Sequence, residues 1–246
     1  MNNSYIQSLR LKKDEIDSFE KYPYNLDVIK NLDEIFFHKN VTFILGENGS
    51  GKSTLLEALA VEYGLNPEGG SNNINFRTKE THSKLSEKII ISKGIVPKDK
   101  FFLRAESFYN VSSEIDNLQE EVGGMLGAYG GKSLHQQSHG EGFFSLFLNR
   151  FGGNGVYILD EPEAALSPQR QLAFLIRLDE LVKQNSQFII ITHSPIILSY
   201  PNSKILEITE NGINEVLYKD TNHYNTYKMF LDNPEYMLRK LKIKVN

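Results

Sequence analysis

The sequence contains no cysteine, which excludes disulfide bonds and thiolate metal sites. It also has no surplus of positive charge: 27 Lys and Arg residues stand against 31 Asp and Glu residues, and the net charge is −4. A chain without a basic surplus lacks the overall field that attracts nucleic acid. The C-terminal stretch RKLKIK still leaves room for a local basic patch.

Long apolar runs are missing as well. No run approaches the roughly 18–20 residues that span a bilayer, and the N-terminal stretch MNNSYIQSLRLKKDEID has no apolar core like that of a signal peptide. The lack of cysteine fits a reducing compartment. From these absences we expect a soluble, cytoplasmic protein.

The 246 residues suffice for a substantial core, and we expect a single domain over 1–246. Short apolar runs predict strands at 5–11, 41–45, 101–107, 156–160, 187–192 and 204–209. Helical patterns occur at 54–63, 141–151 and 168–185, and from 221 onward. Strands that alternate with helices predict an α/β fold with a mostly parallel central sheet and flanking helices.

Three segments stand outside this alternation. Residues 64–100 are polar, and we interpret them as an irregular insertion. Residues 107–150 are predicted to form a small helical subdomain with a glycine-rich break, and 219–246 a helical C-terminal tail. Asn211-Gly212 lies between two β-rich runs and predicts a hairpin.

The most informative segment is GENGSGKS at 46–53, which lies between the apolar run VTFIL and the helix-forming stretch TLLEALAVEY. A strand, the pattern G-x-x-x-x-G-K-S and a helix in this order predict a loop that binds nucleotide phosphates. Its glycines let N–H groups point at anionic oxygens, and the helix N-terminus adds partial positive charge. Lys52 is placed to reach the β- and γ-phosphates, and the Ser53 hydroxyl to bind Mg²⁺. The predicted nucleotide-binding residues here are Gly46, Glu47, Asn48, Gly49, Ser50, Gly51, Lys52, Ser53 and Thr54.

Polar residues also follow two later strands. The run VYILDE ends in Asp160, which is placed to hold Mg²⁺ opposite Ser53, and in Glu161, which is placed to polarise water beside the γ-phosphate. His193 follows the run QFIIIT and is placed to donate to the γ-phosphate; a purely structural histidine is the alternative. We expect Lys52, Glu161 and His193 to be the catalytic groups.

Two further segments hold candidates. Ser138 and Gly140 open an apolar helix in LHQQSHGEGFF, and a helix N-terminus of small residues is a second place to bind an anion, from the same nucleotide or from one held by a partner chain. Glu106 ends the strand FFLRAES and is a candidate Mg²⁺ or coupling residue; a plain strand-end charge is the alternative.

The order of GENGSGKS, SHGEG, YILDEPEAALSP and ITHSP resembles the ATP-binding cassette (ABC) ATPases, over roughly residues 5–210. It looks most similar to small stand-alone bacterial "AAA family ATPase" proteins of that class. The resemblance implies a P-loop NTPase fold of ABC type with an antiparallel β region near the N-terminus. It makes GENGSGKS the Walker A, YILDE the Walker B with Glu161 as catalytic glutamate, and AALS the D-loop. Ser138 and Gly140 then belong to the signature segment, and His193 is the switch histidine.

The chain departs from this pattern in places. His139 and Glu141 stand where transporter cassettes usually carry Gly and Gln, and Ser167 replaces the D-loop aspartate. No Q-loop glutamine is evident, and Glu106 takes its place. In transporters that glutamine contacts the membrane partner, so its absence weakens the case for transport. Family members stack an aromatic residue on adenine ahead of the P-loop; we assign this position to Tyr24, with Tyr22 the alternative, and packing explains either tyrosine equally well.

The resemblance also implies a function. It implies Mg²⁺-dependent binding and hydrolysis of ATP by a head-to-tail homodimer, in which Ser138 of one chain closes over the nucleotide on the other. The expected role is an ATP-driven switch in a soluble process, with a nucleic acid or a protein as further partner. The alternatives are the nucleotide-binding subunit of a membrane ABC transporter, a P-loop small-molecule kinase, and a binding module that never hydrolyses ATP.

Overall fold

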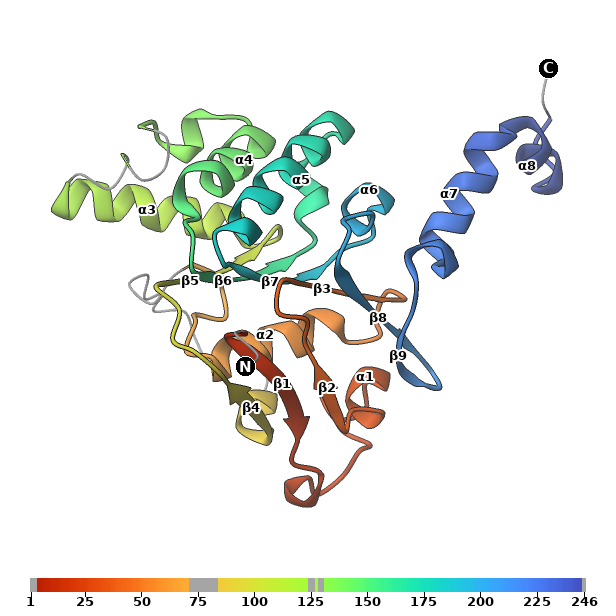
Figure 1. The fold of residues 1–246 in the computed structure, drawn as a ribbon, viewed down its shortest axis with the longest axis horizontal. Coiled ribbons are helices and arrows are strands. Elements are labelled where there is room, and N and C mark those ends of the chain that lie inside the picture. Colours follow the sequence, from red (N-terminus) through yellow and green to blue (C-terminus); the bar gives the residue numbers. More distant parts are fainter. Residues whose placement is uncertain (1–3, 71–83, 124–126, 128–130, 245–246) are drawn as a thin grey trace.

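The computed structural model of the chain describes residues 4–70, 84–123, 127 and 131–244. Six strands form the central sheet, in the order β5-β6-β7-β3-β8-β9 (Figure 1). Their bounds are Val41–Gly46 (β3), Asp99–Arg104 (β5), Gly155–Asp160 (β6), Gln187–Ile191 (β7), Ser203–Thr209 (β8) and Gly212–Glu215 (β9). The first five strands in this order are parallel, and β9 pairs antiparallel with β8 through the hairpin expected at Asn211-Gly212. The predicted α/β fold with a mostly parallel sheet is confirmed.

A second sheet is small and antiparallel. Its strands follow the order β2-β1-β4, with bounds Glu34–Phe36 (β2), Ile6–Leu11 (β1) and Ile89–Lys93 (β4). The expected antiparallel region near the N-terminus is thus present, but β4 comes from the segment predicted to be irregular. That prediction was wrong for β4. Its isoleucines alternate between buried and exposed sides over too short a run to indicate a strand, and the strand forms by pairing with β1. Residues 71–83 of the same segment lie outside the described part of the chain.

Helices cover both faces of the central sheet. Helix α2 (Lys52–Glu62) lies between the two sheets, while α3 (Phe108–Val122), α4 (His139–Arg150), α5 (Pro168–Lys183) and α6 (Pro195–Leu198) cover the opposite face (Figure 1). The core follows this layering because neighbouring residues of a strand point to opposite faces. On β3, for example, Ile44 packs with the α2 side and Phe43 packs with the α4 and α5 side.

The remaining helices are peripheral. Helix α1 (Asp27–Lys30) precedes β2, and α7 (Asn222–Asp232) and α8 (Pro234–Lys240) form the blue extension that leaves the body in Figure 1. Short 3-10 turns occur at Lys13–Glu15, Lys84–Lys88, Leu134–Gln136, Pro162–Ala165 and Tyr218–Asp220. Within the described ranges, no helix combines the length and apolarity that a bilayer crossing requires.

The sequence signals at helix starts explain where α4 and α5 begin. Ser138 accepts a hydrogen bond from the N–H of Glu141, whose carboxylate accepts one in return from the N–H of Ser138. This capping box starts α4 at His139, two positions before the predicted start, because the cap and not the apolar pattern sets the boundary. Ser167 caps α5 by accepting a hydrogen bond from the N–H of Arg170, and Pro168 occupies its first turn, as predicted.

Candidate functional site

The carboxyl ends of β3, β5, β6 and β7 meet at one edge of the central sheet, where ligands of open α/β folds bind. Two cavities open there. The larger, about 1000 Å³, is lined by P-loop residues including Gly46 and Ser50 together with His193 and His223. The smaller, about 210 Å³, is lined by Ser53, Glu106, Asp160 and Glu161 with two alanines. The fold therefore gathers candidates that lie more than a hundred residues apart in the sequence.

The loop between β3 and α2 has the backbone that its glycines predict. Gly51 has φ of 93°, and a Cβ there would lie only 2.8 Å from Val28, so glycine is required both by conformation and by space. The hydroxyl of Ser50 is buried without a hydrogen-bond partner among the described residues. An unpaired buried donor in a loop at a helix N-terminus fits a bound anion.

Lys52 is the buried cation of this loop. Its Nζ donates to the carbonyl oxygens of Gly46 at 2.8 Å and Glu47 at 2.7 Å. Burial lowers the pKa of Lys52, while the carboxylates of Glu161 and Asp160 raise it. The amine therefore lies within the electrostatic reach of both carboxylates, as expected for one phosphate site.

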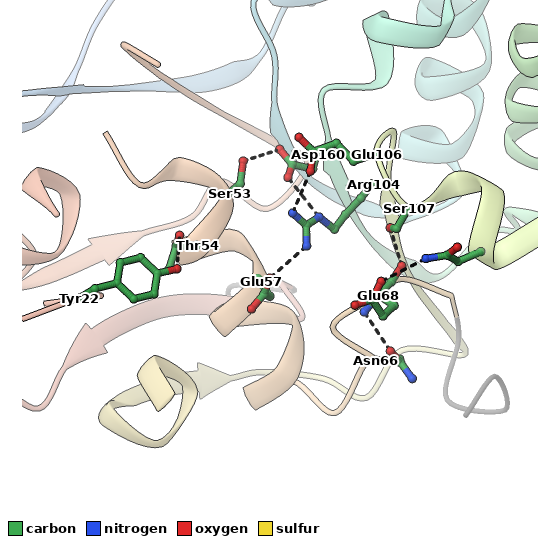
Figure 2. A network of polar contacts seen from close by, with 11 residues as sticks. Tyr22, Ser53, Thr54, Glu57, Asn66, Glu68, Arg104, Glu106, Ser107 and Asp160 are labelled. Carbon is green, nitrogen blue, oxygen red and sulfur yellow. Dashed lines mark hydrogen bonds and ion pairs between the residues drawn. The ribbon is translucent and has the colours of Figure 1, made fainter. Parts of the chain in front are cut away.

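Asp160 is the buried carboxylate of the smaller cavity. The Ser53 hydroxyl donates to its Oδ1 at 3.3 Å, and Arg104 Nε lies 3.6 Å from its Oδ2 (Figure 2). Burial raises the pKa of Asp160 to about 6; Arg104 and the Ser53 hydrogen bond lower it, and Glu161 and Glu106 raise it. A carboxylate and a hydroxyl that already touch can be bridged by a cation without moving either main chain.

These groups suit Mg²⁺. The described residues hold no cluster of three or more acidic or histidine side chains with metal-binding geometry. At the small cavity, the buried carboxylate of Asp160 contacts the hydroxyl of Ser53. Mg²⁺ commonly takes one or two protein oxygens and completes its shell with water and substrate phosphates. The donor set fits such an ion, with Ser53 and Asp160 as its protein ligands. Glu106 lies at the same cavity, but its side chain is 87% exposed and pairs with Arg104.

Arg104 was missed by the sequence analysis. It ends β5 directly beside Asp160 in the register of the sheet, and its Nη1 contacts Glu57 of α2 at 3.0 Å (Figure 2). Its side chain is largely buried, so it connects the helix after the P-loop to the carboxylate of the next strand. The sequence signal was an arginine at the end of FFLR, an otherwise apolar strand. The partner of this arginine can be identified only from the order of the strands in the sheet.

An Arg104→Met substitution should lower the free energy of unfolding by about 3 kcal/mol at neutral pH, because it leaves the buried Asp160 without its cation. The folded-state pKa of Asp160 already lies above its ordinary value, and loss of Arg104 raises it further. A carboxylate whose pKa is raised in the folded state lowers the stability of the protein as pH rises through that pKa, because the unfolded chain ionises more readily. The deficit relative to wild type should therefore be larger at pH 8 than at pH 5.5, in urea melts.

The control is Arg177→Met on α5, since Arg177 has similar exposure but pairs with Glu180 and the carbonyl of Phe151. Its deficit should show no such growth with pH. Equal pH dependence of the two variants would contradict the role given to Arg104.

Glu161 and His193 face each other across the site. Glu161 has φ of 51°, a costly conformation for a residue with a side chain, and its N–H donates to the carbonyl of Ile191. His193 Nε2 lies 3.5 Å from Glu161 Oε1. The half-buried Glu163, also missed from sequence, fixes this pair, because its carboxylate accepts hydrogen bonds from the N–H of His193 and the hydroxyl of Thr192.

Other predicted residues lie elsewhere. Ser138 and Gly140 line neither cavity. Gly140 instead packs against the turn after Glu161, where an added Cβ would clash with the carbonyl oxygen of Ala165. Of the two tyrosines, Tyr24 packs against the core, whereas Tyr22 is 65% exposed and its hydroxyl lies 3.5 Å from Thr54 Oγ1 (Figure 2). The exposed ring is the one free to stack.

Two family models match the chain. One, described as "AAA domain", matches residues 10–123, and the other, described as "AAA ATPase domain", matches residues 142–198. The first match contains the P-loop, and the second contains Asp160, Glu161 and His193.

Curated relatives are named as ATP-binding proteins. The chain is 26% identical to "Ribose import ATP-binding protein RbsA" of Halalkalibacterium halodurans over 72% of this chain and 38% of that protein. It is 28% identical to "Energy-coupling factor transporter ATP-binding protein EcfA2" of Staphylococcus epidermidis over 70% of this chain and 66% of that protein. The matched region thus spans well under half of the first relative's length.

The chain also aligns with solved structures. "An inward-facing conformation of a putative metal-chelate type ABC transporter" aligns over 91% of this chain and 88% of that one, at 17% identity and a TM-score of 0.47. The "SMC head domain from Thermotoga maritima" aligns over 86% of this chain and 98% of that one, at 16% identity and a TM-score of 0.44.

Proposed function

We propose that this chain, an ATPase of the ABC class, binds ATP with Mg²⁺ at the edge of the central sheet that carries the P-loop, and hydrolyses it. The observation that carries this proposal is the convergence of Ser53, Asp160 and Glu161 on one small cavity beside the P-loop. The test is whether the protein releases inorganic phosphate from ATP, and whether this release requires Mg²⁺. Tight ATP binding without phosphate release would leave only a binding module.

Each group has a role that its position supports. Lys52 and the loop N–H groups neutralise charge that spreads over the γ-phosphoryl oxygens, and Mg²⁺ held at Ser53 and Asp160 would add to this neutralisation. Glu161, at the rim of the small cavity, orients or deprotonates the attacking water. His193 donates to the γ-phosphate. Phosphoryl transfer needs mainly positioning and charge stabilisation, and these groups provide both.

Tyr22 is proposed to stack on adenine in place of Tyr24, since its ring is exposed beside the start of α2. Glu106 remains a candidate for outer coordination of Mg²⁺. Its exposure favours contact through water over direct ligation.

The active unit is proposed to be a head-to-tail homodimer. Ser138 lies at the start of α4, away from the chain's own P-loop cavities, with an N-terminal turn that can bind an anion. The same residue in a second chain would close over the nucleotide held here.

If Ser138 acts in trans, the specific hydrolysis rate should rise with enzyme concentration at low concentration and then level off. A rate per enzyme that stays constant down to nanomolar enzyme, with a monomer in sedimentation at that concentration, would contradict the dimer.

Mixing two inactive variants gives a sharper test. Glu161→Gln supplies an intact Ser138, and Ser138→Arg supplies an intact Glu161, so a mixed dimer rebuilds one complete site. The mixture should recover activity that neither variant has alone. No recovery from a mixture that does form heterodimers would place Ser138 outside the site.

The proposed role is an ATP-driven switch in a soluble process, because Glu106 stands where transporter ATPases carry the glutamine that contacts their membrane partner. The specific observation in favour of the alternative is that both curated relatives are named as transport proteins. A membrane protein that co-purifies stoichiometrically with Glu161→Gln in ATP would establish a transporter subunit instead.

A further inference from the structure

The C-terminal helix α7 brings a second histidine to the site. His193 Nδ1 lies 2.9 Å from His223 Nε2, within hydrogen-bond distance, and the two ring centroids are 5.1 Å apart. His223 also lines the larger cavity together with the P-loop. It lies beyond residue 198, where the second family match ends, so neither match covers it.

The position of His223 is fixed by the chain around it. The buried Thr221 caps α7 by accepting from the N–H of Tyr224, and its hydroxyl donates to the carbonyl of Tyr218. The hydroxyl of Tyr218 in turn donates to the carbonyl of Pro195, two residues after His193. The start of α7 is therefore attached to the segment that carries His193.

The surroundings of both imidazoles favour the neutral form. Burial lowers the pKa of His193, and Lys52 lowers it further against an opposing effect of Glu161. Burial likewise lowers the pKa of His223, followed by the effect of His193. A neutral imidazole carries one N–H and one acceptor nitrogen, so a hydrogen bond between the rings fixes the tautomer of both.

Two arrangements satisfy the contact, and their consequences differ. If His193 donated from Nδ1, its Nε2 lone pair would face the Glu161 carboxylate at 3.5 Å, and His223 would keep a buried Nδ1–H. That N–H would have no acceptor, since His223 Nδ1 is buried and unpartnered among the described residues. A buried donor without a partner and a lone pair against a carboxylate are both unfavourable.

In the second arrangement His223 donates from Nε2 to His193 Nδ1. His193 then carries its proton on Nε2, which is buried without a hydrogen-bond partner among the described residues but faces the Glu161 carboxylate at 3.5 Å, and His223 keeps a bare acceptor nitrogen at Nδ1. Each arrangement leaves one donor nitrogen and one acceptor nitrogen without a hydrogen bond, so the charge of Glu161 decides between them, because a carboxylate attracts an N–H and repels a lone pair. The second arrangement is therefore favoured.

We propose that His223 is a positioning residue that holds His193 in the tautomer with the proton on Nε2, ready to donate to a phosphate oxygen or to Glu161. The proposal rests on the proposed function, because it assigns the use of that proton to the ATP site. It makes the start of α7 part of the hydrolytic machinery, although α7 lies outside both family matches.

The test uses the full chain and three variants. His223→Leu removes the donor and should lower the kcat for ATP hydrolysis about tenfold or more, by analogy with loss of the hydrogen-bond partner of a metal-binding histidine, while KM for ATP stays within about twofold. His223→Gln places an amide N–H near the same position and should retain most of the rate. Thr226→Ala, at an exposed position of the same helix, is the control for α7 itself.

A second readout does not depend on turnover. In ¹⁵N NMR spectra of the imidazoles, with His193 assigned by the signal lost in His193→Gln, wild type should show His193 protonated on Nε2. His223→Leu should show mixed protonation of the two nitrogens.

The outcomes separate the two proposals. No phosphate release by wild type would reject the proposed function, while the NMR signal would still judge the tautomer. Phosphate release by wild type with an unchanged kcat in His223→Leu would reject the role of His223. A wild-type His193 that carries its proton on Nδ1 would do the same, as would a His223→Gln variant no faster than His223→Leu.

Discussion

A Glu161→Gln variant is expected to bind ATP with nearly wild-type affinity and to hydrolyse it about 10²–10⁴ times more slowly, the range lost when a general base is removed. Glutamine keeps the shape of the side chain. It also leaves intact the backbone hydrogen bond from Glu161 to Ile191, so the local fold should survive. What it removes is the negative charge that orients or deprotonates water at the rim of the small cavity.

Two measurements check this expectation: phosphate release under saturating ATP, and ATP affinity by calorimetry. If product formation is what separates the two chains, the variant should also accumulate as a dimer in ATP. Glu180→Gln on α5, a half-exposed carboxylate paired with Arg177, is the matched control and should hydrolyse normally. Hydrolysis by Glu161→Gln at the wild-type rate would show that another group handles the water.

A Lys52→Ala variant is expected to lose ATP affinity by about 10- to 100-fold. A hydrogen bond to a charged group contributes about 1.5–3 kcal/mol, and each 1.4 kcal/mol is a factor of ten. Lys52 is buried and its amine contacts two carbonyl oxygens of the loop, so the substitution also loosens the loop that must receive the phosphates.

Lys100→Ala provides a matched control for Lys52→Ala. Lys100 Nζ also donates to two carbonyl oxygens, those of Tyr63 and Gly64, and burial lowers its pKa as it does for Lys52. It lies near the start of β5, at the end of the sheet away from the P-loop. Calorimetry should find ATP affinity unchanged in Lys100→Ala; equal losses in the two variants would reject the phosphate role of Lys52.

The parts of the site that sequence predicted are those encoded by local patterns. The P-loop, the pair Asp160-Glu161 and His193 each follow a continuous apolar strand, and parallel strands deliver their carboxyl ends to one edge. The alternation of β-runs and helical patterns was enough for the fold class because buried parallel strands read as continuous apolar runs.

The parts that sequence missed depend on contacts between distant segments. In the sequence, Arg104 is only a charge at the end of a strand. Its contact with Asp160 follows from the pairing of β5 with β6. His223 begins a polar-looking helix and gains meaning only from its contact with His193. Tyr22 and Tyr24 differ in burial, which their near-identical sequence surroundings do not reveal.

The close approach at Gly140 has a consequence for communication between sites. Because no side chain separates α4 from the turn that follows Glu161, the start of α4 contacts that turn directly, and Arg170 of α5 pairs with Glu141 of α4 at 3.3 Å, so a shift of the turn would press on the start of α4. In the proposed head-to-tail dimer, the turn after Glu161 lies beside one nucleotide and the start of α4 acts on the other. The two segments would then move as one unit. Loss of the γ-phosphate on one side would be transmitted mechanically to the opposite side through a contact that only glycine permits.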